Sequence, residues 1–229
     1  MTYQNLSNEL EELKNPSRAK ISQRFFKTGK GQYGEGDVFL GLDTATMVKT
    51  ALKYGDLPLF DLQKLLQSPI HECRAAALVI LKRQFQKADV KKQEQIQTFY
   101  LTNAHQINNW DLVDISAPLI LAGLTWSARL KLARSENLWE RRMAMMSTFE
   151  LIKQGQFDQT LKLAKFFLTD SHDLIHKAVG WLLREVGKRN LAAEMAFLEQ
   201  YASQMPRVML RYALEKLPAA ERQCYLKIK

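Results

Sequence analysis

Residues 177–184 read Lys177-Ala178-Val179-Gly180-Trp181-Leu182-Leu183-Arg184. The stretch opens with a basic residue followed closely by a small one, and variants of that opening recur along the chain. They are Arg74-Ala75-Ala76-Ala77, Arg142-Met143-Ala144 and Arg211-Tyr212-Ala213. Ala144, Ala178 and Ala213 are 34 and 35 residues apart, and Ala76 lies twice 34 residues before Ala144. A period of this size, with two helices per repeat, is typical of an α-solenoid of the HEAT, armadillo or TPR kind.

Nearly all of the chain predicts helices, because apolar residues recur at helical spacing and Gly, Pro, Asp and Ser separate the segments. The predicted helices are 2–14, 17–27, 43–54, 57–67, 69–86, 90–104, 108–123, 125–134, 138–153, 156–168, 172–188, 190–202, 206–216 and 218–227. The TPR signature is not evident. We therefore expect an all-α fold, a superhelix (α-solenoid) of HEAT-like two-helix repeats, as a single domain over residues 1–229. The small residue of each repeat should lie where two helices cross closely.

The stretch 28–38 is the exception, because it holds four of the ten glycines and is followed by Val38, Phe39 and Leu40. It predicts either a flexible loop or a short β-hairpin near residues 28–39. A phosphate-binding P-loop is excluded, since the Gly-Lys-Ser/Thr ending is absent. Lys30 and Tyr33 at its tip can touch DNA; an exposed loop without a partner is the alternative.

The composition points to a negatively charged partner. Lys and Arg number 33 against 24 Asp and Glu, which leaves a net charge of +9. Nucleic acid is the first candidate, and a basic surface without a partner is the alternative. Cys73 and Cys224 predict free thiols rather than a disulfide framework. Without a visible secretory signal or an apolar run of about 20 residues, we expect a monomeric protein of the bacterial cytoplasm or nucleoid, with no membrane partner.

Basic residues recur near the start of the inner helices of the predicted repeat. Arg74, Arg142 and Lys177 would therefore line one edge of the solenoid, where evenly spaced cations suit evenly spaced phosphates. A solvated charged face explains the same pattern without a ligand.

Two predicted helix faces combine tryptophan with charge. Trp110 and Asp114 are four residues apart and share a face. The second face carries Lys177, Trp181, Arg184 and Lys188. Core packing, with Asp114 paired to a nearby arginine, is the structural alternative. Trp126 and Trp139 lack such company and are interpreted as packing residues.

The sequence shows no motif for a metal site or for a catalytic nucleophile. His172 and His176 are four residues apart, but a glutamate beside the first and a third ligand are missing, so we predict no metal and no cofactor. A serine or cysteine nucleophile elbow is also absent.

Three segments together resemble the signature helices of the DNA alkylation repair enzymes of the AlkD type. They are Asn109-Trp110-Asp111-Leu112-Val113-Asp114, Leu138-Trp139-Glu140-Arg141-Arg142-Met143-Ala144 and Lys177-Ala178-Val179-Gly180-Trp181-Leu182-Leu183-Arg184-Glu185. The resemblance extends from residue 15 to about residue 190. It implies a HEAT-like-repeat DNA glycosylase of base excision repair, which hydrolyses the N-glycosidic bond of positively charged alkylpurines such as N3-methyladenine and N7-methylguanine in duplex DNA.

Carried over by motif, the resemblance implies that Trp110 and Trp181 line the lesion cleft and that Asp114 is the catalytic carboxylate. Arg142 and Arg184 would hold the DNA backbone, and we add Lys177, Arg74, Lys188, Lys30 and Tyr33 as candidate DNA contacts.

Two departures from the family pattern keep a second function open. Phe25 stands where the resembled enzymes have a tyrosine, and residues 28–38 look like an insertion. Relatives with a hairpin there are associated with branched DNA. The alternative is therefore a non-catalytic binder of branched or distorted, Holliday-junction-like DNA. A third interpretation, a protein scaffold, predicts no salt-dependent DNA binding.

Overall fold

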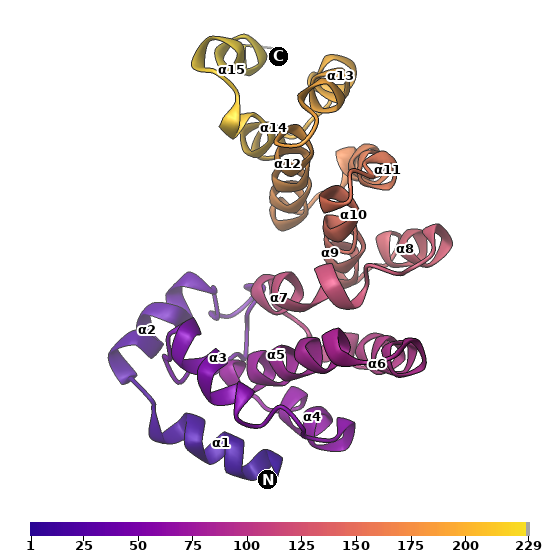
Figure 1. Cartoon of the computed structure of the whole chain (residues 1–229). Coiled ribbons are helices and arrows are strands. Elements are labelled where there is room, and N and C mark those ends of the chain that lie inside the picture. Colours follow the sequence, from indigo (N-terminus) through magenta and orange to yellow (C-terminus); the bar gives the residue numbers. More distant parts are fainter. Residues whose placement is uncertain (228–229) are drawn as a thin grey trace. The chain divides into compact units, whose positions relative to one another are not determined.

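The computed structural model describes residues 1–227, and these form α-helices joined by loops and 3-10 turns, with the longest loop between α2 and α3 (Figure 1). The α-helices are α1 (Tyr3–Glu12), α2 (Pro16–Phe25), α3 (Thr44–Leu52), α4 (Leu59–Leu66), α5 (His71–Lys87), α6 (Val90–Thr102), α7 (Trp110–Ile120), α8 (Trp126–Ala133), α9 (Leu138–Met146), α10 (Phe149–Lys153), α11 (Asp158–Phe166), α12 (Asp173–Gly187), α13 (Leu191–Tyr201), α14 (Arg207–Ala213) and α15 (Ala219–Leu226). The 3-10 turns are Ala104–Gln106, Phe167–Thr169 and Leu214–Lys216. The prediction of an all-α helical repeat is confirmed.

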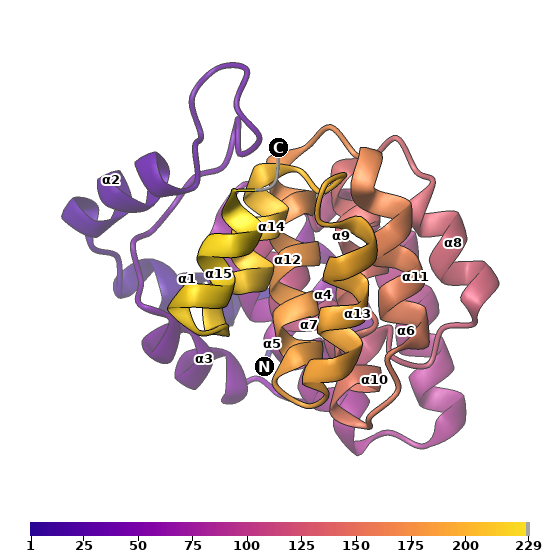
Figure 2. The ribbon, with the colours of Figure 1, turned by 90° about the horizontal axis from the view of Figure 1, so that it is seen from above.

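The glycine-rich stretch is a loop rather than a hairpin. Between α2 and α3 the chain makes a series of turns and forms no strand (Figure 2). Val38 makes a single isolated bridge with Ile70. Of the two predicted alternatives for residues 28–39, the structure therefore has the loop.

Side-chain caps set several helix starts. α2 begins after Asn15, whose Oδ1 accepts a hydrogen bond from the Arg18 N–H at 3.1 Å, and Pro16 occupies the first helical position. Ser17, a residue type that often caps helices, lies inside this helix. Proline is favoured at that first position because its missing N–H would have no helical partner there, so Asn15-Pro16 starts α2.

The predicted helix 138–153 is divided into α9 and α10. Ser147 Oγ donates to the Ala144 carbonyl and Thr148 Oγ1 to the Met145 carbonyl, both at 2.8 Å. Such hydroxyl bonds satisfy the backbone locally in place of the helix ladder. The break lies where these two residues follow each other.

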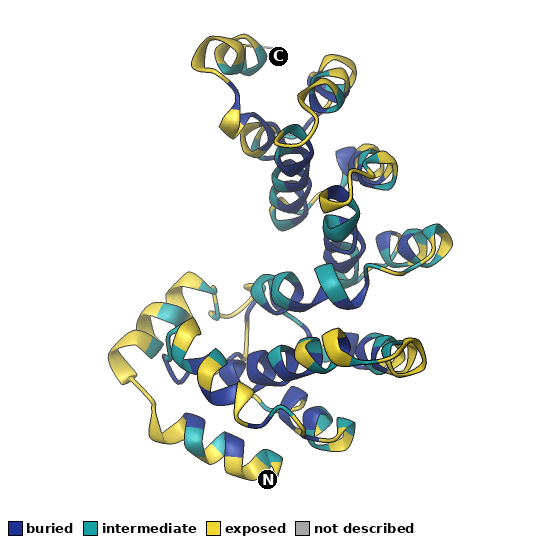
Figure 3. Ribbon diagram, viewed as in Figure 1, coloured by how far each residue is buried: buried dark blue, intermediate teal, exposed yellow. Residues whose placement is uncertain are grey.

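The chain divides into two compact units, Met1–Ser116 and Ala117–Lys229, and the boundary lies within α7. The single domain over residues 1–229 stays a prediction. In the first unit, α5 packs against α3, α4 and α6 and is largely buried, as its dark blue ribbon shows (Figure 3). α2 buries no residue at all. Its exposed surface includes Ile21 and Phe25.

In the second unit, α12 is the central helix and packs against α9, α13 and α14. Ala144, Ala178 and Ala213 are buried, as expected for small residues at close crossings. A close crossing of backbones lies at Gly180, where a Cβ atom would meet the Met209 carbonyl oxygen at 2.3 Å. Glycine is therefore required at this position for α14 to approach α12.

Candidate functional site

Trp110 and Asp114 lie on α7 and are both half-buried. Asn109, the residue before the helix, accepts a hydrogen bond from the Trp110 N–H at 2.8 Å through its side-chain oxygen. This contact lies at the first residue of α7. An aromatic ring and a carboxylate therefore follow each other by one helical turn, as the sequence predicted.

The Trp110 indole belongs to an aromatic cluster. Phe26 stacks on it at 5.3 Å between ring centroids with 19° between the planes, and Phe39 stacks on Phe26 at 4.9 Å and 17°. Phe25, 63% exposed, meets Trp110 edge-on at 5.9 Å. Phe25 therefore contributes an aromatic edge to the cluster, and the stacked rings hold the indole in one orientation.

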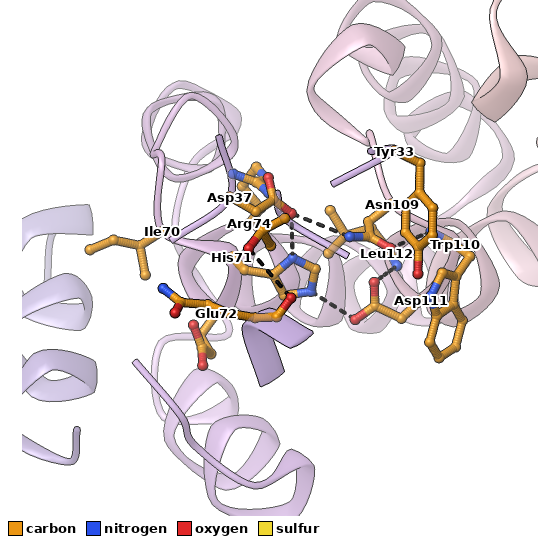
Figure 4. Close-up of polar contacts among 12 residues, drawn as sticks. Tyr33, Asp37, Ile70, His71, Glu72, Arg74, Asn109, Trp110, Asp111 and Leu112 are labelled. Carbon is orange, nitrogen blue, oxygen red and sulfur yellow. Dashed lines mark hydrogen bonds and ion pairs between the residues drawn. The ribbon is translucent and has the colours of Figure 1, made fainter. Parts of the chain in front are cut away.

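A buried polar network lies beside this cluster (Figure 4). His71, the first residue of α5, contacts Asp37 Oδ2 through Nδ1 at 3.1 Å and Asp111 Oδ2 through Nε2 at 2.7 Å. Arg74 donates to Asp37 Oδ1 at 2.5 Å, and Asn109 donates to Asp37 Oδ2 at 3.3 Å. Asp37, at the end of the glycine-rich loop, thus holds the starts of α5 and α7 together.

The network keeps His71 protonated at neutral pH. Burial alone would lower the pKa of His71, but the hydrogen bonds to Asp111 and Asp37 outweigh it and raise the pKa to about 9. Burial would raise the pKa of Asp37, yet the hydrogen bond from His71 and the charge of Arg74 leave it below its usual value. Two carboxylates and two cations therefore compensate one another in the interior.

The loop that carries Asp37 is tied to α5 at further points. Val38 accepts from the His71 N–H at 2.8 Å. The buried Glu72 carboxylate accepts from the N–H groups of Leu40, Gly41 and Leu42 at 2.9, 2.8 and 3.3 Å. Sequence patterns missed this anchorage, although an aspartate that ends a glycine-rich run and a histidine that opens a helix were visible.

The second unit carries the other predicted face on α12. Trp181 is half-buried and lies 5.6 Å from the Phe149 ring. Lys177 is half-buried as well. Arg184 is ion-paired with Glu215, and Lys188, the C-cap, with Glu185 at 2.5 Å. These two cations already have carboxylate partners within the protein.

Two predicted DNA contacts are buried instead. Arg74 is 4% exposed and binds Asp37 and the Ser68 carbonyl. Arg142 is 5% exposed and donates to the Leu174 carbonyl at 2.5 Å. The repeat placed both correctly near the starts of α5 and α9, but their guanidinium groups join neighbouring elements. Their role in DNA binding stays a prediction.

The remaining candidates have simpler surroundings. Lys30 is exposed on the loop, and the Tyr33 hydroxyl lies 3.5 Å from the Phe25 carbonyl oxygen. His172 caps α12 by accepting from the Leu174 N–H, and His176 contacts the Asp170 carbonyl at 2.6 Å. Within residues 1–227 no group of three His, Cys, Asp or Glu side chains is arranged to hold a metal, and no helix is both long and apolar enough to cross a membrane.

Cysteine and the other tryptophans follow the sequence expectations in part. Cys73 is a buried free thiol, which confirms its prediction. Trp139 is buried and packs as expected. Trp126 is half-buried, and the Lys162 ammonium lies 5.9 Å from its ring centroid.

Comparison with known proteins identifies relatives of this architecture. The family model described as DNA alkylation repair enzyme matches residues 6–217. A solved structure, titled as a predicted DNA alkylation repair enzyme from Enterococcus faecalis, superimposes with a TM-score of 0.68 at 18% identity, over 90% of this chain and 97% of that one. None of the curated proteins matches the sequence.

Proposed function

We propose that this protein is a DNA glycosylase. It belongs to the DNA alkylation repair enzyme family, and belonging to that family supports a role in DNA repair. Its substrates are positively charged alkylated purines in duplex DNA, such as N3-methyladenine and N7-methylguanine, and its reaction is hydrolysis of the N-glycosidic bond. Asp114 is the catalytic carboxylate. Trp110 and Trp181 contact the lesion, and no cofactor takes part.

The chemistry suits a site with one carboxylate. An alkylated purine carries its positive charge while bonded to the sugar, so it leaves as a neutral base and no general acid is needed to protonate it. Ordinary glycoside hydrolysis needs two carboxyl groups, because one of them must protonate the leaving group. A single carboxylate stabilises the oxocarbenium-like sugar and positions the water that attacks it. An indole face attracts the cationic base by roughly 1–2 kcal/mol once water is excluded.

The observation that carries the proposal is the pairing of Trp110 and Asp114 on one turn of α7. The ring is oriented by Phe26, which stacks on it. Asp111, the neighbouring acid, is bound to His71 at 2.7 Å. We assign Asp114 to the sugar because it lies one helical turn after Trp110, on the same face of α7.

The test is single-turnover release of methylated base by the wild type and by Asp114→Asn. The amide keeps the size of the side chain but not its charge, so release should fall about 10²–10³-fold, with duplex binding retained. Glu94→Gln, on the exposed surface of α6, is the matched control and should release base at the wild-type rate. Full activity of Asp114→Asn would contradict the mechanism.

A second candidate, a non-catalytic binder of branched DNA, draws on the loop. Lys30 is exposed there, and Gly31 and Gly36 adopt φ of 74° and 87°, which favour glycine. Deleting the loop would also remove Asp37 and its network. The better test is therefore Lys30→Gln, with binding to four-way junctions and linear duplexes compared. This function would be favoured if Lys30→Gln lost binding to junctions but not to linear duplexes, and if the wild type released no methylated base.

A further inference from the structure

The first unit holds a groove that the sequence did not reveal. It has a volume of about 930 Å³ and lies between the C-terminal halves of α3 and α5, the loop 53–58 and the start of α6. Apolar side chains from three helices line part of it: Val48, Leu52, Val79 and Ile115. Gln84 closes one wall, because its Nε2 donates at 2.8 Å to both the Gly55 and Leu57 carbonyls. The loop is thereby fixed against α5.

The groove is positively charged. Its lining includes Lys82, Arg83, Lys87 and Lys92, and no carboxylate among residues 1–227 forms an ion pair with any of them. The fifth cation, Lys53, pairs with Glu9. Asp56 is the acidic residue of the lining. Cations beside apolar walls produce a stronger field than the same charges on an open surface.

Helix electrostatics accounts for only some of these cations. Lys87 ends α5, where a positive charge is favourable against the helix dipole. Lys92 lies in the first turn of α6, where the dipole disfavours a cation, and the carboxylate of the N-cap Asp89 accepts from its backbone N–H at 2.8 Å. Because Lys87 and Lys92 line the same groove, an anionic ligand held there would interact with both charges.

The groove is distinct from the His71 network but continuous with α7. His71 and Lys87 are the two ends of α5, so at 1.5 Å per residue they are about 24 Å apart. The lining also includes Ile115 of α7, the residue that follows Asp114 in the sequence. The groove therefore borders the helix that carries the candidate carboxylate.

We propose that this groove binds the phosphate backbone of duplex DNA next to the lesion, independently of the sequence and of the damage. A duplex presents a phosphate about every 1.7 Å of its axis, so one ligand can satisfy several cations together. The inference rests on the proposed function for its partner, duplex DNA, but it concerns binding and not base release.

The test compares two triple variants that each remove three positive charges. Lys82→Gln/Lys87→Gln/Lys92→Gln removes the three groove lysines other than the ion-paired Lys53. Lys14→Gln/Lys64→Gln/Lys91→Gln is the control, because these lysines do not line the groove and form no ion pairs within the described chain. Binding to an unmodified linear duplex is measured between about 50 and about 200 mM salt. Because each lost phosphate contact lowers the slope of log K against log salt by about 0.9, the groove variant should lose roughly 2–3 of slope.

The control should keep the wild-type slope. A wild-type salt slope in the groove variant, or an equal loss of slope in both variants, would overturn the inference. So would groove-dependent binding of poly-glutamate with DNA binding unaffected, which would assign the groove to an acidic protein. Release of methylated base at saturating enzyme separates the two proposals. Slope loss in the groove variant with no release by the wild type would contradict the glycosylase alone, and normal release with no slope difference would contradict the groove alone.

Discussion

Raising the pH should weaken the first unit through His71. The pKa of His71 lies near 9 in the folded protein, because its bonds to Asp111 and Asp37 outweigh burial, against an ordinary value of 6.5. Below pH 6.5 both folded and unfolded chains carry the proton, so the stabilisation is fully present. Between pH 6.5 and 9 only the folded chain keeps it, and stability falls by about 1.4 kcal/mol for each pH unit. The loss over the whole interval is at most about 3 kcal/mol.

Denaturant unfolding of the wild type and His71→Gln, followed from about pH 6 to about pH 9.5, measures this contribution. Groups that titrate in both proteins cancel in the difference. The advantage of the wild type should be largest at the acidic end and should decline by up to about 3 kcal/mol toward the alkaline end. A difference that stays constant with pH would refute a protonated His71 between two carboxylates, and an NMR titration of the imidazole would show the same result directly.

Three further predictions concern the second unit. Arg129 is 1% exposed and donates to the carbonyls that follow α7, so Arg129→Met should lower the free energy of unfolding by about 3–5 kcal/mol; a loss no larger than that of the exposed Arg134→Met would contradict this role. Gly180→Ala should cost about 1–3 kcal/mol by forcing α14 from α12, whereas Gly55→Ala, whose Cβ would meet its nearest atom at 3.5 Å, should change stability by less than about 0.5 kcal/mol. Burial raises the pKa of Glu194 to about 7, so ionisation of this carboxyl lowers the free energy of unfolding as pH rises from 4.5 to 7. The change in the free energy of unfolding caused by Glu194→Gln should therefore be more favourable at pH 8 than at pH 4, by up to about 3 kcal/mol. A change that is the same at both pH values would count against the raised pKa.

Much of the fold follows from local patterns. The 34- and 35-residue period placed Ala144, Ala178 and Ala213 in the core, because small residues recur where helices cross. The break between α9 and α10 was not predictable from apolar periodicity, since two hydroxyl side chains, Ser147 and Thr148, decide it locally. For residues 28–38 the sequence left a flexible loop and a short β-hairpin as alternatives, because glycine permits the backbone conformations of both.

The candidate site was predictable only where its members share a helix. Trp110 and Asp114 are related by one turn, so their common face is written in their spacing. Asp37, His71 and Asp111 are separated by 34 and 40 residues, and only the packing of the loop on α5 and α7 brings them together. The positions of Arg74 and Arg142 near helix starts indicated phosphate contacts. Their burial was not predictable, because it depends on partners from distant segments.

The most direct measurement is base release from two duplexes, one methylated to carry N3-methyladenine and N7-methylguanine and one carrying hypoxanthine, a modified purine without charge. Wild-type protein should release the methylated bases as neutral purines and leave hypoxanthine in place, because a site without a general acid requires the charge to be in the base already. Asp114→Asn should release the methylated bases about 10²–10³-fold more slowly than the wild type and should also leave hypoxanthine in place. Equal release of hypoxanthine, or no release of methylated base by the wild type, would contradict the account.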